Sequence, residues 1–175
     1  MKISGEYKML HIYKSFSELD IEQLMLVYLQ GNWENGSLLY PECGENEQRR
    51  RAEDDFISYL REDFFSHPDA FYAVWAPDGC YKAALRLEPY RDGLLLEALE
   101  TAPEARRQGF ATVLIREVVS YLQPLKWACI YSHIHKRNIA SLNVHKKCGF
   151  QIVSDSATYI DGTVTQSSYT LRYDF

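Results

Sequence analysis

Three apolar segments of strand length follow one another in the middle of the chain, at 70–76, 81–88 and 94–101. The segments 77–79 (Pro-Asp-Gly) and 89–93 lie between them, and their Gly, Pro and Asp residues favour tight turns. Strands joined by short turns pair antiparallel. The pattern therefore predicts a three-stranded meander.

The spacing of apolar residues becomes helical after residue 109. It predicts a helix over 109–122, a strand over 127–135 and a second helix over 138–147. A strand, helix, strand succession requires a right-handed crossover and parallel pairing of the two strands. We therefore expect a parallel pair next to the antiparallel meander.

The flanking segments predict further elements. Helices are expected at 17–29, with Ser17 as a candidate N-cap, and at 48–65. The segment between them, 31–47, is rich in Gly and Asn and is expected to form a long loop. The remaining strands are predicted at 8–13, 151–155 and 166–173, with a turn at 161–162.

Together the predicted elements form one α/β (α+β) domain over residues 1–175. Its mixed, mostly antiparallel central sheet has about 6–7 strands and is flanked by about 4 helices. A chain of 175 residues is of ordinary size for one domain.

Composition and charge narrow the function classes. The chain has 24 acidic against 19 basic residues, a net charge of −5, which opposes nucleic-acid binding over a wide face. It contains no apolar run of the roughly 20 residues that span a bilayer, and no apolar leader at the N-terminus. The four cysteines form no CxxC pair and are interpreted as reduced thiols rather than as a disulfide framework. A cytoplasmic protein without a membrane partner is expected.

The most informative segment is the strand-to-helix junction after Pro103. Arg106, Arg107, Gly109 and Ala111 open the helix there. The first turn of a helix has unpaired N–H groups and the positive end of the macrodipole, so it binds phosphate readily. The two small residues keep that backbone approachable. The alternative interpretation is a glycine-containing turn beside two solvated arginines.

Two sequence motifs give this segment a more specific functional interpretation. Arg106, Gly109 and Ala111 match Q/R-x-x-G-x-G/A, and 99–103 precedes them in the manner of a bulged strand. About thirty residues later, 138–150 (NIASLNVHKKCGF) resembles N-x-x-A-x-x-L-Y-x-x-x-G-F, with His145 at the position of the tyrosine. In this order they resemble motifs A and B of the Gcn5-related N-acetyltransferase (GNAT) superfamily. The resemblance covers about residues 70–154.

The resemblance implies acetyl-coenzyme A (acetyl-CoA) as co-substrate. Backbone N–H groups at 108–111 would hold the pyrophosphate, and the strand edge 99–101 would bind the pantetheine arm. That arm would lie where the fourth and fifth strands splay apart. Asn138 would contact the pantetheine or the acetyl end, and it is also a favoured N-cap. The implied coenzyme-binding residues are Leu99, Glu100, Thr101, Arg106, Arg107, Gln108, Gly109, Phe110, Ala111, Thr112, Asn138, Ser141 and His145.

The catalytic residues are less well defined. His145 replaces the motif B tyrosine, which in the family protonates the departing thiolate; it either supplies that proton or merely packs against the sheet. For the general base we prefer Glu100, which is nearer the splay, to Glu97, with water relays as a further alternative. Strand alternation places the two carboxylates on opposite faces unless a bulge intervenes.

Two other side-chain groups could carry chemistry. His133 and His135 share a strand face and could bind one metal ion, but no third ligand has recognisable spacing. We therefore interpret them as ordinary histidines and expect no metal. Cys148 has no evident base partner and is interpreted as a small core residue.

The expected function is transfer of an acetyl group from acetyl-CoA to a primary amine of a small molecule, directly, within a ternary complex. A peptide or protein N-terminus is the alternative acceptor, and a non-catalytic acyl-CoA sensor is the alternative function. The acceptor cleft is expected between 31–47, the following helix and the C-terminal hairpin. A homodimer is one assembly that the sequence allows. The candidate acceptor-lining residues are Trp33, Tyr40, Trp75, Tyr159 and Tyr169.

Overall fold

The computed structural model describes residues 9–175, so position 8 of the first predicted strand lies outside the described residues. Its main sheet has seven strands in the order β1-β2-β3-β4-β5-β9-β6. Their bounds are β1 (Leu10–Tyr13), β2 (Phe71–Trp75), β3 (Ala83–Tyr90), β4 (Gly93–Thr101), β5 (Cys129–His135), β6 (Gln151–Ser154) and β9 (Ser168–Asp174). A small second sheet pairs β7 (Ala157–Thr158) with β8 (Val164–Thr165).

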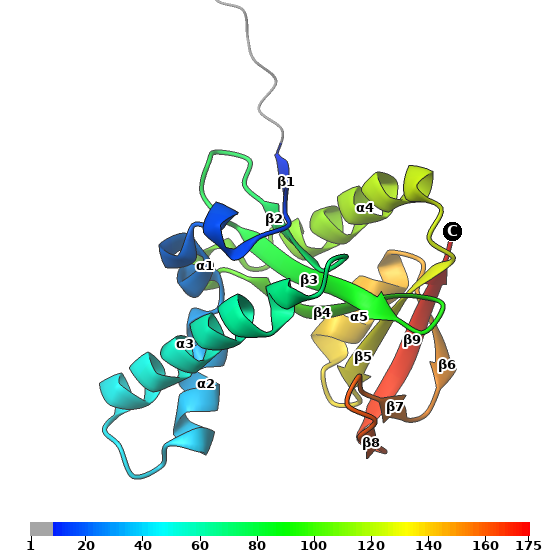
Figure 1. The fold of residues 1–175 in the computed structure, drawn as a ribbon. Coiled ribbons are helices and arrows are strands. Elements are labelled where there is room, and N and C mark those ends of the chain that lie inside the picture. Colours follow the sequence, from blue (N-terminus) through cyan, green and yellow to red (C-terminus); the bar gives the residue numbers. More distant parts are fainter. Residues whose placement is uncertain (1–8) are drawn as a thin grey trace, which may run out of the picture.

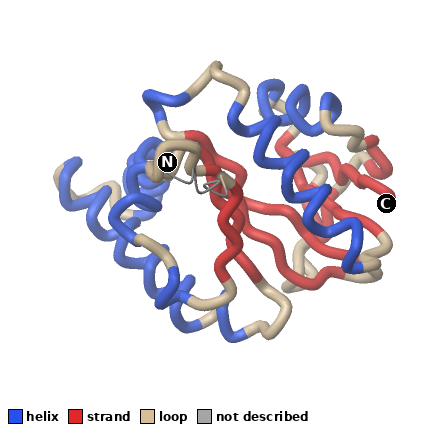
Figure 2. The backbone as a smooth tube through the Cα atoms, turned by 90° about the horizontal axis from the view of Figure 1, so that it is seen from above, coloured by secondary structure: helices blue, strands red, loops and turns tan. Residues whose placement is uncertain are grey.

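The helices form two layers, one on each face of the sheet (Figures 1 and 2). They are α1 (Ile21–Val27), α2 (Leu29–Leu39), α3 (Glu45–Glu62), α4 (Phe110–Leu122) and α5 (Ile139–Lys147). α1 and α3 cover one face, with α2 packed against α3, and α4 and α5 cover the other. The mixed sheet between helices confirms the predicted fold class.

Each face of the sheet has its own core. On the α4 side, alternate strand residues such as Leu85, Leu96 and Ile130 are buried against Leu114 and Val118 of α4. On the other side, the residues in between pack against α1 and α3. This alternation decides which side chains can reach each side of the splayed strands.

The middle of the chain folds as predicted. β2, β3 and β4 form an antiparallel meander with Tyr72 opposite Arg86 and Arg86 opposite Glu97. β4 then pairs parallel with β5 after the crossover through α4. The predicted parallel pair is therefore confirmed.

The parallel pairing is short, and this creates an opening in the sheet. It runs only from Leu94, opposite Ile130, to Leu96, opposite Ser132. Beyond these residues β4 continues to Thr101 and β5 to His135, but the two strands no longer pair. The fourth and fifth strands therefore splay apart, as the family resemblance implied.

The N-terminal third differs from the prediction in two places. The helix expected over 17–29 begins at Ile21, because the Asp20 side chain caps it by accepting from the Gln23 N–H at 3.1 Å. The long loop expected over 31–47 is wrong, since α2 occupies most of it. Gly36 is buried there, and a Cβ on it would lie 2.4 Å from the Gln48 carbonyl oxygen of α3. It therefore permits close helix packing and does not mark a loop.

Within residues 9–175, no helix combines the length and the apolar character needed to cross a membrane. All four cysteines lie in this part of the chain, and none of them is in a disulfide.

Candidate active site

A bulge interrupts β4 at the point where the strands separate. Arg86 pairs with Glu97 and Ala84 with Glu100, so two residues of β4, Ala98 and Leu99, lie opposite one residue of β3. Ala98 has a φ of 50°, in the left-handed region that non-glycine residues rarely adopt. The extra residue cancels the alternation, and Glu97 and Glu100 therefore face the same side of the sheet.

A cavity of about 650 Å³ opens beside this bulge, between β4, α4 and α5. It is of the size that small-molecule and cofactor sites have. Eleven of the predicted coenzyme-binding residues line it: Leu99, Glu100, Thr101, Arg106, Arg107, Gly109, Phe110, Ala111, Thr112, Asn138 and Ser141. Of the other two, Gln108 is exposed and does not line the cavity, and His145 lies in a neighbouring one.

The N-terminus of α4 forms one wall of this first cavity. Its N-cap is Gly109, whose φ of 85° lies in the left-handed region. No atom lies within 4 Å of a Cβ built on this residue, so the space next to the helix terminus is open. The N–H groups of the first turn, which have no partner within the helix, can therefore receive an anion there.

Charged side chains also line this cavity. Arg106, Arg107 and Lys147 line the cavity together with Glu34 and Glu100. The Arg106 guanidinium lies 3.7 Å from the Glu100 carboxylate, and it donates to the Thr101 carbonyl oxygen at 3.3 Å. Burial raises the pKa of Glu100, and the nearby Arg106 opposes that rise. The lining of the cavity therefore carries three positive charges against two carboxylates.

Sequence reasoning missed the contribution of α2 to this cavity. Gln30, Gly31 and Glu34 close its outer side, and Gln30 accepts a hydrogen bond from Arg106. No sequence signal pointed to them, because the segment was expected to be a loop and its contact with Arg106 spans 76 positions of the chain.

A second cavity of about 180 Å³ adjoins the first through three shared residues, Leu99, Asn138 and Ser141. Glu97 lines it and forms an ion pair with Arg86, with 3.1 Å between guanidinium nitrogen and carboxylate oxygen. The Arg86 guanidinium lies over the Tyr59 ring of α3, at 4.8 Å from its centre.

His145 lines the second cavity from α5 and is 1% exposed. Its Nδ1 lies 2.9 Å from the Ser141 carbonyl oxygen, which can only accept, so Nδ1 carries the proton. Burial lowers the pKa of this imidazole. The ring also packs edge-on against Phe150.

Asn138 has both positions that the sequence suggested. Its side-chain oxygen accepts from the Ser141 N–H at 3.0 Å and so caps α5. It also lines both cavities. Cap and cavity wall thus coexist in one residue.

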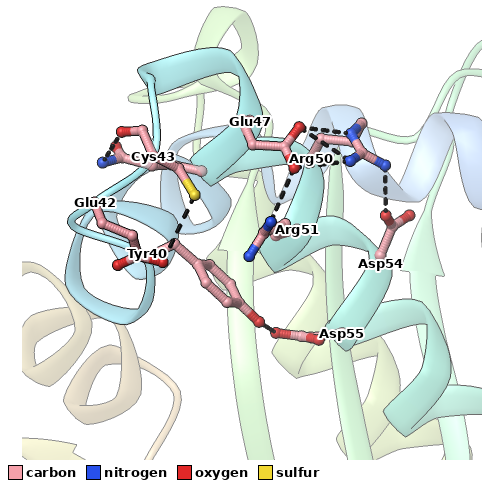
Figure 3. A network of polar contacts seen from close by, with 9 residues as sticks. Tyr40, Glu42, Cys43, Glu47, Arg50, Arg51, Asp54 and Asp55 are labelled. Carbon is pink, nitrogen blue, oxygen red and sulfur yellow. Dashed lines mark hydrogen bonds and ion pairs between the residues drawn. The ribbon is translucent and has the colours of Figure 1, made fainter.

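The structure disperses the candidate acceptor-lining aromatics. Trp33 and Tyr40 belong to the α2–α3 hairpin, where Tyr40 donates to Asp55 within a network of surface ion pairs (Figure 3). Trp75 is buried in the core on the α4 side, and Tyr169 lies beneath Lys136. Two of the five are near the second cavity: Tyr159, with its ring 5.4 Å from that of His133, and Tyr169, which lies opposite the lining residue Ile134 in the sheet.

The two strand histidines also separate. His133 lines the second cavity, whereas His135 is exposed, and its Nδ1 accepts from the Arg137 N–H at 3.2 Å. Across residues 9–175, no group of three or more His, Cys, Asp or Glu residues is placed to hold a metal ion. The Cys148 thiol contacts the Thr112 carbonyl oxygen of α4, at 3.6 Å.

Comparisons with solved structures show the same fold. The PaiA N-acetyltransferase from Thermoplasma acidophilum, in complex with coenzyme A, matches with a TM-score of 0.62 at 16% identity over 95% of this chain and 99% of that chain. A putative streptothricin acetyltransferase from Bacillus anthracis with acetyl coenzyme A gives 0.53 at 15% over 67% and 70%. The ribosomal-protein-S18-alanine N-acetyltransferase from Escherichia coli gives 0.53 at 17% over 70% and 76%. The curated protein sequences contain no match.

The chain therefore has an acetyltransferase fold. Residues 33–150, more than half of it, match the model of the acetyltransferase (GNAT) family, and the chain belongs to that family. This confirms the resemblance drawn from the two motifs.

Proposed function

We propose that the protein is an enzyme that transfers the acetyl group of acetyl-CoA to a primary amine, directly, within a ternary complex. The observation that carries the proposal is the continuity of the two cavities at the splayed strands. A donor in the first cavity and an acceptor at the second would meet at their shared residues, Leu99, Asn138 and Ser141. The proximity of two reactants held in this way lowers the barrier to their reaction.

The first cavity suits the charged and extended parts of coenzyme A. The pyrophosphate would bind the N–H groups at the start of α4, close to Arg106 and Arg107. The pantetheine amides would pair with the edge of β4 from Leu99 to Thr101, which β5 leaves free. Two of the three matching structures named above are complexes with coenzyme A or acetyl coenzyme A, which supports this assignment.

The second cavity supports a small-molecule amine as acceptor. A cavity of about 180 Å³ accommodates the aminoalkyl group of a small molecule more readily than the N-terminus of a peptide or protein. The names of the matching proteins span both acceptor classes, a streptothricin and a ribosomal protein alanine. A peptide N-terminus is therefore the alternative acceptor.

For catalysis we propose that His145 relays a proton, while each of the two predicted carboxylates, Glu100 and Glu97, has a feature that opposes a role as base. Glu100 has the raised pKa that suits a base, but it lies in the first cavity beside Arg106. Glu97 lies in the second cavity, but it is paired with Arg86. His145 enters the reaction without a proton on Nε2. It can therefore only pass to the sulfur a proton that it first receives.

The alternative function is a sensor that binds acyl-CoA without turnover, and the replacement of the motif B tyrosine by His145 favours it. Calorimetry with coenzyme A, followed by thiol release from acetyl-CoA over a broad amine panel, separates the two functions. Binding with amine-dependent thiol release supports the enzyme, and binding without release supports the sensor. Absence of binding overturns both.

We further infer a cytoplasmic protein with neither a nucleic-acid nor a membrane partner. The net charge of −5 opposes contact with phosphate backbones, and the four unpaired cysteines suit a reducing compartment. Light scattering would show whether a homodimer forms.

A further inference from the structure

Two imidazole nitrogens in the described part of the chain are buried without a hydrogen-bond partner, His133 Nε2 and His145 Nε2. Both rings line the second cavity. A buried acceptor without a donor is costly, and native proteins leave few of them. The pair therefore indicates that a ligand atom carrying hydrogen belongs in this cavity.

The hydrogen bonds around His133 fix its tautomer. The Thr170 hydroxyl donates to the Ser156 carbonyl oxygen at 2.7 Å, because a carbonyl can only accept. The Thr170 oxygen is then free to accept from His133 Nδ1, which lies 3.2 Å away. The proton of the neutral ring is consequently on Nδ1, and Nε2 presents a lone pair to the cavity.

The two histidines approach the cavity from opposite faces of the sheet. Ile130 and Ile134 of β5 point into the core on the α4 side, so His133, which alternates with them, points to the face of α1–α3. His145 comes from α5, on the face of α4. The cavity thus passes through the splay from the donor face to the face that carries Glu97.

The charges around His133 leave it available as a base. Glu97 of β4 and Arg91 of the β3–β4 turn are the charged groups near it, and they act on it in opposite directions. The rings of Tyr90 from β3 and Tyr159, which follows β7, flank it edge-on at 5.5 and 5.4 Å. Burial is the largest influence and lowers the pKa of the imidazole, and a hydrogen bond to the Thr158 backbone opposes part of this lowering. A pKa below the ordinary value favours the uncharged ring at neutral pH.

We propose that His133 is the general base that deprotonates the acceptor amine. The inference rests on the proposed function and assigns the base of that same reaction. His133 Nε2 takes one proton from the ammonium group and frees the nitrogen lone pair, which attacks the thioester carbon. The C–N bond forms and the C–S bond breaks, with its electron pair going to sulfur. A second N–H proton passes through His145 Nε2 to the thiolate, and the first leaves His133 to solvent.

The test is the variant His133→Asn, compared with His135→Gln on the same strand. The Asn amide can still donate to Thr170, so the contact remains while the lone pair of Nε2 is lost. We expect kcat to fall about 100-fold or more, with little change in the Kd for coenzyme A. In the wild type kcat/KM should rise with pH through the lowered pKa of His133, and the variant should lack this rise. The exposed His135 should tolerate its change.

Thr170 is a positioning residue in this proposal. Thr170→Val should lower kcat and shift the pH profile because the ring loses the partner that fixes its tautomer, and Thr170→Ser should restore both. NMR of 15N-histidine-labelled protein provides a readout independent of turnover. It should show Nε2 of His133 without a proton at neutral pH.

The outcomes distinguish a failure of the base assignment from a failure of the proposed function. Unchanged kcat and an unchanged pH profile in His133→Asn overturn the base assignment, while wild-type turnover leaves the proposed function in place. A proton on Nε2 at neutral pH overturns the assignment whatever the kinetics. A wild type that binds coenzyme A but acetylates no amine overturns the proposed function and the base assignment together.

Discussion

The bulge in β4 depends on a chain of two buried tyrosines, and removal of one hydroxyl tests that dependence. Tyr28 of the α1–α2 junction donates to the Ala98 carbonyl oxygen at 2.5 Å. Tyr72 of β2 donates in turn to the Tyr28 hydroxyl at 3.2 Å. Tyr28→Phe leaves the ring packing in place but removes the central member of this chain.

The expected loss of stability follows from the polar groups that Tyr28→Phe leaves without a hydrogen-bond partner. A typical hydrogen bond contributes about 0.5–1.5 kcal/mol, and a buried polar group left without a partner costs about 1–3 kcal/mol. Both the Ala98 carbonyl and the Tyr72 hydroxyl lose their partner, and Tyr72 is completely buried. We therefore expect Tyr28→Phe to lower the free energy of unfolding by about 2–3 kcal/mol. For a chain of this length that corresponds to a fall in Tm of roughly 4–12 °C.

Urea unfolding measures the loss of stability, and calorimetry with coenzyme A measures a second expected effect, on coenzyme binding. Since the Tyr28 contact holds the strained Ala98, its loss should also loosen the strand edge from Leu99 to Thr101 and weaken coenzyme binding several-fold. The matched control is Tyr72→Phe, which spares the bond to Ala98 and should cost only about 1 kcal/mol. A Tyr28→Phe variant within 0.5 kcal/mol of the wild type, or equal to Tyr72→Phe, would refute the role of the hydroxyl chain.

Four further variants, with Gly79→Ala as the control for Gly109→Ala, test the site and the sheet beside it. Gly109→Ala and Gly79→Ala introduce a Cβ at similar φ angles, 85° and 80°, with no neighbour within 4 Å. Each should lower the free energy of unfolding in urea by about 1–2 kcal/mol. Only Gly109→Ala should also weaken coenzyme binding in calorimetry, by about tenfold or more. Burial and the adjacent Glu97 raise the pKa of Glu88, so its contribution to stability is present below its unfolded pKa and is lost as pH rises through the folded value. Glu88→Gln should therefore gain stability relative to the wild type as pH rises from the unfolded pKa of about 4.3 through the raised folded pKa, and a constant difference in urea unfolding would contradict this. His145→Asn should keep coenzyme binding and lose most of the thiol release, and full release would show that His145 only packs.

The sequence sufficed for the features that depend on local pattern. The meander, the crossover and the α4 terminus follow from periodicity, turn residues and Gly109, and eleven predicted residues line one cavity. The prediction of a loop in the α2 segment was wrong because Gly36 is buried against α3, where the absence of a side chain on glycine permits the two helices to touch. Composition alone cannot separate this use of glycine from a turn.

The acceptor side was harder to predict because its members meet only through long-range geometry. Regular strand alternation would place Glu97 and Glu100 on opposite faces of the sheet, but the bulge at Ala98 brings them to the same face. His133 belongs to no motif, and its spacing from His135 points only to a metal site. Its relevance depends on where β4 and β5 stop pairing, which no local pattern encodes.

The two irregularities of the sheet have complementary effects, and together they explain how one fold can hold both substrates. The end of β4–β5 pairing after Leu96 leaves backbone groups and a cavity open, which suits a ligand recognised mainly through its phosphates and amides. The bulge turns Glu97 and Glu100 to the face opposite α4, the face that His133 also occupies. The donor side is thus built mainly from backbone and recurs as a motif, whereas the acceptor side is built from side chains. Variation among relatives should therefore concentrate on the face of His133, where a change of side chain changes the amine without disturbing the coenzyme.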